Sequence, residues 1–81
     1  MNTVIDLADE RTRRAIVLAA ESGQWVRCTA RDGRQLFGIP ARKAGLHYLV
    51  DAHSCTCRDF VYRRGPCKHI TAVRIVEALA A

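Results

Sequence analysis

Residues 55–69 read CTCRDFVYRRGPCKH and contain three cysteines and one histidine in two close pairs. One residue separates Cys55 from Cys57, one separates Cys67 from His69, and nine residues separate the two pairs. Three thiols and an imidazole are the ligand set of a closed, tetrahedral structural zinc site, which leaves no coordination position for a substrate or an activated water. The stretch therefore predicts a bound Zn²⁺ that holds the chain together. A disulfide framework, or four unrelated buried thiols, is the alternative.

The spacing within each pair suits ligation of one metal ion. On an extended segment, Cys55 and Cys57 point to the same side, because alternate residues share a face. Cys67 and His69 stand at the start of an expected helix, where both side chains reach a metal from the first turn.

The longer stretch 48–73, YLVDAHSCTCRDFVYRRGPCKHITAV, resembles the SWIM-type zinc finger, whose pattern is C-x-C, a variable spacer and C-x-H. The likeness extends to Asp59 and Phe60 after the first pair and to Pro66 and Ile70 around the second. This resemblance implies a zinc-binding module, often attached to transposases, helicases or other nucleic-acid enzymes, that binds DNA or protein partners. It implies no reaction.

Length and composition favour one small domain that a metal stabilises. At 81 residues a hydrophobic core alone tends to be marginal, and a metal is a common remedy. The sequence has neither an apolar run of about 18 residues nor a basic start followed by an apolar run, which argues against a membrane span and a secretory signal. We therefore expect a cytoplasmic protein, in which reduced thiols favour metal ligation over disulfides.

The sequence pattern predicts a small α+β fold in a single domain over residues 1–81. A helix is expected over 6–22, with Asp6 or Asp9 as its N-cap and Gly23 as its C-cap. Strand-like runs at 24–30, 35–39 and 46–51 predict a short antiparallel three-stranded sheet within 24–51. Asp32-Gly33, a pair typical of tight hairpins, joins the first two runs.

The zinc finger is expected over 53–80, as a zinc knuckle followed by a C-terminal helix from about Pro66 to Leu79. Phe60 and Tyr62 are expected to cover the metal. The ligand and the apolar face of the helix point the same way, so metal binding should be coupled to core formation. The predicted stripe comprises His69, Ala72, Val73, Val76 and Ala80.

Three further residues are potential ligands by type alone. Cys28 lies outside both pairs, and we expect it to pack as a small buried hydrophobe. His53 is expected in a surface turn, because four better-placed ligands already satisfy zinc. His47 falls on the strand face opposite Tyr48 and Val50 and is given no catalytic task.

Positive charge is concentrated in the part of the chain that carries the finger. Residues 1–22 hold three arginines against four carboxylates, whereas residues 23–81 hold ten Lys or Arg against four carboxylates. Eleven of the thirteen cations are Arg, which makes forked contacts to phosphate. A solubilising surface is the alternative. The residues predicted to contact nucleic acid are Arg58, Arg63, Arg64, Lys68 and Arg74, extended by Arg42 and Lys43.

The arginines of the first helix, Arg11, Arg13 and Arg14, lie mostly off its apolar stripe. Pairing with Asp9 and Glu10 on a solvated face is favoured for them over a DNA contact.

The functional prediction is a non-catalytic module that binds nucleic acid, DNA rather than RNA. The sequence has no Gly-rich phosphate loop, carboxylate pair with acid/base spacing or His-Glu zinc-hydrolase motif, so we expect neither an enzyme nor a small-molecule substrate. The alternative is a protein-interaction adaptor, in which Val61, Tyr62 and an exposed strand edge meet a protein partner.

Overall fold

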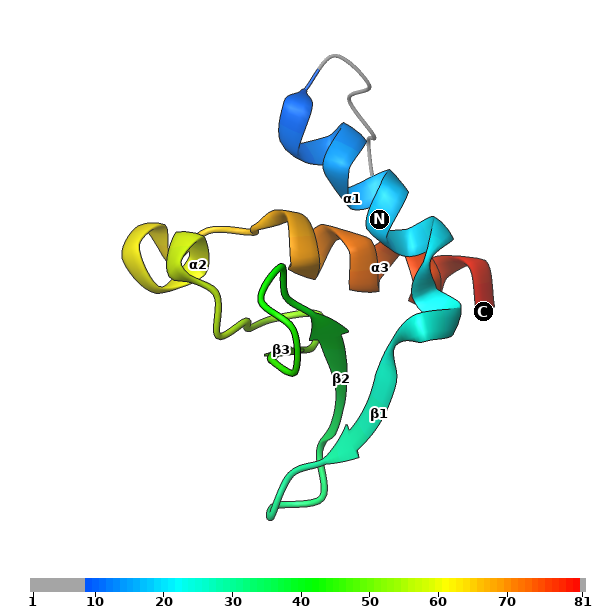
Figure 1. The fold of residues 1–81 in the computed structure, drawn as a ribbon, viewed down its shortest axis with the longest axis vertical. Helices are drawn as coiled ribbons and strands as arrows, with labels where there is room; N and C mark the ends of the chain where they lie inside the picture. Colours follow the sequence, from blue (N-terminus) through cyan, green and yellow to red (C-terminus); the bar gives the residue numbers. More distant parts are fainter. Residues whose placement is uncertain (1–8, 81) are drawn as a thin grey trace.

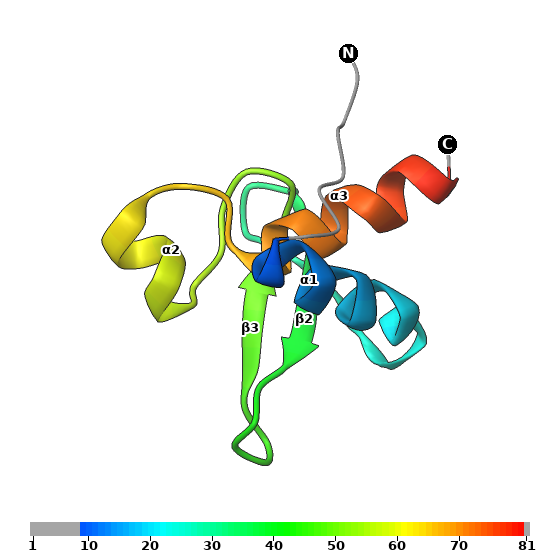
Figure 2. The same cartoon turned by 90° about the horizontal axis from the view of Figure 1, so that it is seen from above.

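The computed structural model describes residues 9–80, which form a small α+β fold, as predicted. Its elements are, in chain order, α1 (Glu10–Ala20), η1 (Ser22–Gln24), β1 (Val26–Thr29), β2 (Gln35–Pro40), β3 (His47–Val50), α2 (Arg58–Arg63) and α3 (Lys68–Ala80). Helix α1 packs across α3, and the short helix α2 stands to one side (Figures 1 and 2). None of the helices within residues 9–80 combines the length and apolar character that crossing a membrane requires.

The three strands form an antiparallel sheet in the order β1-β2-β3, and one face of it carries the core. Phe37 lies opposite Val50 and Ile39 opposite Tyr48 in the β2–β3 register. These four side chains belong to the core or pack against it. Successive side chains of a strand point to opposite faces, so His47 lies on the outer face, where it is exposed.

Helix α1 begins at Glu10, and Asp9 is its N-cap, because the Asp9 side chain accepts a 2.9 Å hydrogen bond from the N–H of Arg11. The predicted start at residues 6–8 lies outside the described residues. At the other end the prediction of Gly23 as C-cap is wrong. The C-cap is Glu21, and Gly23 lies in the 3₁₀ turn without a positive φ.

The segment between the two ligand pairs, expected to be part of a zinc knuckle, contains helix α2. Asp59 in its first turn accepts two hydrogen bonds from Arg63 in its last turn, at 2.7 and 3.1 Å. This pairing and the favourable placement of both charges relative to the helix dipole support the helix. Arg64 ends it in the left-handed conformation, with φ 58°, and its N–H donates to the Phe60 carbonyl at 2.8 Å.

Helix α3 begins at Lys68, two residues later than the predicted start at Pro66. Ile70, which lies outside the predicted stripe, is buried, whereas within the stripe Val76 is only half-buried and Ala80 is exposed. The buried side chains of α3 are His69, Ile70, Ala72 and Val73.

The hydrophobic core includes three of the four predicted zinc ligands, the cysteines, as packing partners. Its buried side chains come from β2, β3, the ligand segment and α3, and Leu18, Trp25, Phe37, Tyr48 and Phe60 pack around them. The metal cluster is therefore part of the hydrophobic core. The buried members are Ile39, Val50, Cys55, Cys57, Cys67, Ile70 and Val73.

The position of the core predicts that truncating two isoleucines to alanine lowers the free energy of unfolding by different amounts. Ile70 is 1% exposed, whereas Ile16 on α1 is 36% exposed. Ile70→Ala should lower the free energy of unfolding by about 2–5 kcal/mol, because it opens a cavity in the core. Ile16→Ala, the matched control, should cost roughly 1 kcal/mol or less. Chemical denaturation of the zinc-loaded protein measures both, and equal costs would show that α3 does not form the core.

Candidate metal centre

The structure brings the four predicted ligands together. One potential ligand atom from each of Cys55, Cys57, Cys67 and His69 lies within 4.8 Å of all the others. All four residues are at most 5% exposed. Three sulfurs and one imidazole nitrogen are a donor set that suits Zn²⁺ and fills its four tetrahedral positions. The group therefore fits a structural zinc ion.

A tight turn positions the first ligand. After β3 the chain turns through residues 51–54, where the N–H of Asp51 donates to the carbonyl of Ser54 at 3.0 Å. One carboxylate oxygen of Asp51 accepts the N–H groups of His53 and Ser54, both at 2.7 Å, and the Ser54 hydroxyl at 3.2 Å. An isolated bridge then pairs Val50 with Cys55. Asp51 thus sets the direction in which the chain enters the cluster.

Sequence reasoning missed Asp51, although Asp at the start of a turn that bonds its own backbone two or three residues on is a known signal. Burial raises the pKa of the Asp51 carboxyl, but hydrogen bonds from His53 and Ser54 outweigh it and bring the pKa below its ordinary value. The folded turn therefore favours the ionised carboxylate.

Helices position the other three ligands. Cys57 is the N-cap of α2, and its Sγ accepts a hydrogen bond from the N–H of Phe60 at 3.5 Å. Cys67 directly precedes α3, and its carbonyl accepts the N–H of Thr71 at 3.0 Å. His69 lies in the first turn of α3, where its Nδ1 is 3.8 Å from the Cys67 sulfur.

Tyr48, rather than Tyr62, covers the cluster. The Tyr48 ring lies 4.7 Å from the His69 imidazole, centroid to centroid. Phe60, which was also predicted to cover the metal, packs against the buried cluster that contains the three cysteines. The same prediction for Tyr62 is wrong, since this side chain is 76% exposed. Residues two apart on a helix point to nearly opposite sides, so α2 turns Tyr62 outward when Phe60 points inward.

The close packing of the sulfurs favours a bound cation. A hydrogen bond from the Cys55 thiol lowers the pKa of Cys67, and the same hydrogen bond together with burial raises the pKa of Cys55. Burial also raises the pKa of Cys57. The protein alone thus stabilises one thiolate at the expense of the others. A divalent metal lets all three ionise, because it neutralises their mutual repulsion.

Cys28 and His53 lie apart from the cluster. Cys28 is only half-buried, on the outer face of β1, so the prediction that it packs as a buried hydrophobe is wrong. His53 is exposed in the turn before Cys55. Neither belongs to the group of four potential ligands.

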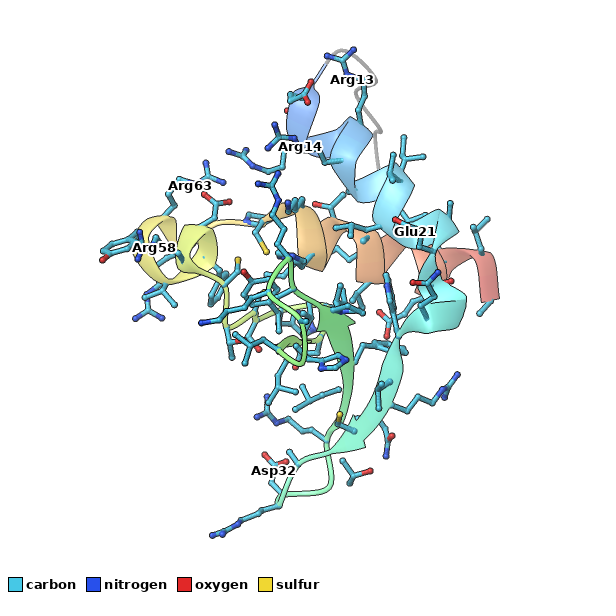
Figure 3. The ribbon with its side chains drawn as sticks, in the orientation of Figure 1. Arg13, Arg14, Glu21, Asp32, Arg58 and Arg63 are labelled. Atoms are coloured by element: carbon cyan, nitrogen blue, oxygen red, sulfur yellow. The ribbon has the colours of Figure 1, made fainter. Side chains whose placement is uncertain are left out.

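Four of the predicted nucleic-acid residues lie in α2, at its C-cap or at the start of α3. Arg58 opens α2 and Lys68 opens α3, and both line a cleft next to the cluster. Arg63 and Arg64 end α2, with Arg63 paired to Asp59. Arg58 and Arg63 both extend from α2 on the side of the molecule away from the β1–β2 hairpin (Figure 3).

The other three predicted cations do not join this group. The Arg74 Nε donates to the carbonyl of Ala52 at 2.9 Å, so Arg74 braces the turn before the first cysteine pair. Arg42 and Lys43 lie in the β2–β3 loop, which projects away from α2 (Figure 2).

Two arginines of α1 line the same cleft as Arg58 and Lys68, a placement that sequence reasoning missed. Arg14 pairs with Glu10 at 3.2 Å, and Arg13 pairs with Glu10 at 2.9 Å, as the expected local pairing required. Arg11 differs, because its Nε lies 3.7 Å from the carboxylate of Asp59 on α2. No sequence pattern signals a contact between residues so far apart.

The model of the SWIM zinc finger family matches residues 27–74, which is more than half of the chain. The matched segment contains all four clustered ligands. The protein therefore belongs to the SWIM zinc finger family, a family of small zinc-binding modules and not of enzymes. Comparisons with curated proteins and with solved structures gave no match.

Zinc in this site would act as a structural cross-link. Cys55 and Cys57 would tie the turn after β3 and the start of α2 to the start of α3, through Cys67 and His69. With four protein ligands, no position remains for a metal-bound water.

We predict one zinc ion per chain in protein purified under reducing conditions. Cys57→Ser should lose the metal, because three ligands and a poorer donor remain. Cys28→Ser is the matched control and should keep it. Elemental analysis with a thiol count decides the matter, and loss of zinc from the Cys28 variant would show that the ligand set is misassigned.

Asp51→Asn should lower the free energy of unfolding of the zinc-loaded protein by about 1–3 kcal/mol, since three hydrogen bonds to a charged carboxylate become weaker bonds to a neutral amide oxygen. The Asp51 side chain is 18% exposed, whereas Asp32, which bonds Arg34 in the β1–β2 hairpin, is 59% exposed. Asp32→Asn should therefore have a much smaller effect. Denaturation with urea measures both variants, and equal stabilities would contradict the role given to the Asp51 turn.

Proposed function

We propose that this zinc finger is a non-catalytic module that binds nucleic acid through phosphate contacts, DNA rather than RNA. The observation that carries the proposal is the placement of Arg58 and Arg63 in α2 and of Arg64 at its C-cap, on a helix whose N-cap is a zinc ligand. All three side chains are exposed. Arg is suited to this contact because its planar guanidinium binds phosphate oxygens in pairs.

The metal centre gives these cations fixed positions. Cys57 caps α2 and is itself one of the clustered ligands, so α2 is anchored at its first turn. The Asp59–Arg63 pair and the Arg64 N–H bond then hold the remainder of the helix. A cation on an anchored helix loses less conformational entropy on binding than a cation on a mobile loop. This favours α2 as a backbone-contacting element.

The preference for DNA rests on the resemblance to modules that accompany transposases and helicases, together with the basic charge of the chain. The formal net charge is +5. Phosphate contacts alone carry no base information, so the proposal includes no preferred sequence.

A protein-interaction adaptor is the second candidate, because α2 also presents apolar side chains. Val61 is 50% exposed and Tyr62 is 76% exposed. The outer edge of β1 is unpaired within residues 9–80, and it offers backbone groups to an added strand. Salt separates the two candidates, since apolar contacts depend on it weakly and phosphate contacts steeply.

Binding of a labelled duplex should weaken steeply with salt, with a log–log slope of about −0.9 for each phosphate neutralised. Arg63→Gln combined with Arg64→Asn should weaken binding to all sequences about equally, and Asn tolerates the left-handed conformation at position 64. The matched control is Arg27→Gln with Arg31→Asn, which removes the same charge from the β1–β2 hairpin and should have a smaller effect.

Fluorescence anisotropy at several salt concentrations measures these affinities, and zinc content checks that each variant is folded. A zinc-loaded domain that binds neither single-stranded nor duplex nucleic acid at about 50 mM salt, where counterion release favours binding, would overturn the proposal. The adaptor would then be the better account.

A further inference from the structure

A cleft of about 500 Å³ adjoins the metal centre. The start of α1 forms one wall, and the starts of α2 and α3 form the other. Tyr48 and the ligands Cys57, Cys67 and His69 line it as well. Its volume falls in the range of roughly 300–1,000 Å³ that is typical of ligand pockets, so a phosphate group with its sugar fits.

Four cations line this cleft. Arg11 and Arg14 come from α1, Arg58 is the first residue of α2, and Lys68 is the first residue of α3. A cation in the first turn of a helix opposes the helix dipole, so folding stability does not account for Arg58 and Lys68. Figure 3 shows Arg14 on the side of α1 towards α2, whereas Arg13 lies at the outer end of α1.

Three carboxylates in the cleft oppose these cations: Asp9, Glu10 and Asp59. Glu10 pairs with Arg14 at 3.2 Å, and Asp59 lies 3.7 Å from Arg11 and 2.7 Å from Arg63. Three thiolates with one divalent zinc would add one negative charge at the floor. Four cations against three carboxylates and this charge leave the cleft close to neutral, and two of the cations, Arg11 and Arg14, are paired with carboxylates.

We propose that this cleft binds a phosphodiester group of a nucleic-acid strand, with Arg14 and Arg11 of α1 as binding residues and Glu10 and Asp59 as internal competitors. The inference rests on the proposed function and deepens it, because it adds α1 to a surface that otherwise comprises α2 alone. Each phosphate that binds Arg11 or Arg14 must replace a carboxylate partner, so these ion pairs lower the affinity of the cleft.

A phosphate can replace the carboxylate partner of each arginine at low energetic cost, because these ion pairs are exposed. The side chains of Arg14 and Glu10 are 63% and 61% exposed, and those of Arg11 and Asp59 are both 41% exposed. Exposed pairs contribute little to stability, whereas an arginine that binds phosphate in a forked manner makes two charge-assisted hydrogen bonds. A phosphate that enters the cleft therefore gains more than the broken pairs cost.

The first test compares two neighbouring arginines of α1. Arg13 and Arg14 are both exposed and both pair with Glu10, but only Arg14 lines the cleft. Arg14→Ala should make the log–log salt slope for a labelled duplex shallower by about 0.9, the value for one lost phosphate contact. Arg13→Ala should leave the slope unchanged. Equal slopes and equal affinities in the two variants would overturn the proposal.

The second test removes a competitor. Glu10→Gln should strengthen binding by about two- to fivefold, a range that matches the strength of exposed ion pairs. Glu77→Gln removes the same charge from α3, where Glu77 is exposed and does not line the cleft, and should change affinity less. Asp9 is unsuitable for this test because it caps α1. Weaker binding by the Glu10 variant would contradict the role of competitor.

The outcomes separate this inference from the proposed function. Binding that requires Arg63 and Arg64 but is indifferent to Arg14 and Glu10 would leave the nucleic-acid module intact and overturn the cleft. Absence of any binding by the zinc-loaded parent would overturn both. Zinc content and circular dichroism of each variant establish that a change in affinity is not a loss of fold.

Discussion

The structure depends on one constraint: three sulfurs and an imidazole must share the interior of a very small domain. Cys55, Cys57 and Cys67 belong to the same buried cluster as the aliphatic core residues, and His69 lies beside them under Tyr48. Three close thiols repel one another once ionised, and buried polar groups without partners are costly. A metal ion removes both problems at once, because it neutralises the thiolates and completes their coordination.

Several features of the fold follow from this cluster. The Asp51 turn directs the chain into Cys55, Cys57 starts α2, and Cys67 and His69 start α3, so the ligands define where three local structures begin. Helix α1 then packs across α3. The free energy of zinc binding is also large enough to determine whether the domain folds. Apparent binding free energies for structural zinc are about 10–16 kcal/mol, comparable with the roughly 5–15 kcal/mol net stability of a whole domain.

The attachment of α2 and α3 to the metal cluster also fixes where the surface cations lie. Cations stand at the starts of α2 and α3, close to the cluster, and α1 adds two more across the cleft. Most of these arginines are paired with carboxylates in the folded protein. The surface is therefore less attractive to phosphate than the net charge of +5 suggests, and its local pairing decides which cations are available.

The sequence predicted the ligands, the sheet and the first and last helices because these depend on local spacing. Two close Cys/His pairs, alternating strands and the apolar stripe of α3 are visible without tertiary information. The same reasoning failed where distant parts of the chain meet. The Arg11–Asp59 contact, the cover of Tyr48 over His69 and the cleft depend on how α1, β3 and α2 are placed in space.

Helix α2 was missed for a different reason, since six residues give too short a pattern for a periodic signal. Its ends are capped by a cysteine sulfur and by a left-handed arginine, neither of which is a common cap. The prediction for Gly23 was wrong because a residue typical of helix C-caps lies just beyond the helix but does not adopt the left-handed conformation of such a cap.

The most direct test of this account is a titration of the reduced, metal-free protein with Zn²⁺, followed by amide proton–nitrogen correlation spectra. If the core forms only when the metal binds, the metal-free protein will give poorly dispersed signals. A single equivalent of zinc will then restore dispersion for β3, α2 and α3 together. A metal-free protein with the same dispersed spectrum as the zinc-loaded form would contradict the account, because the core would then form without its cation.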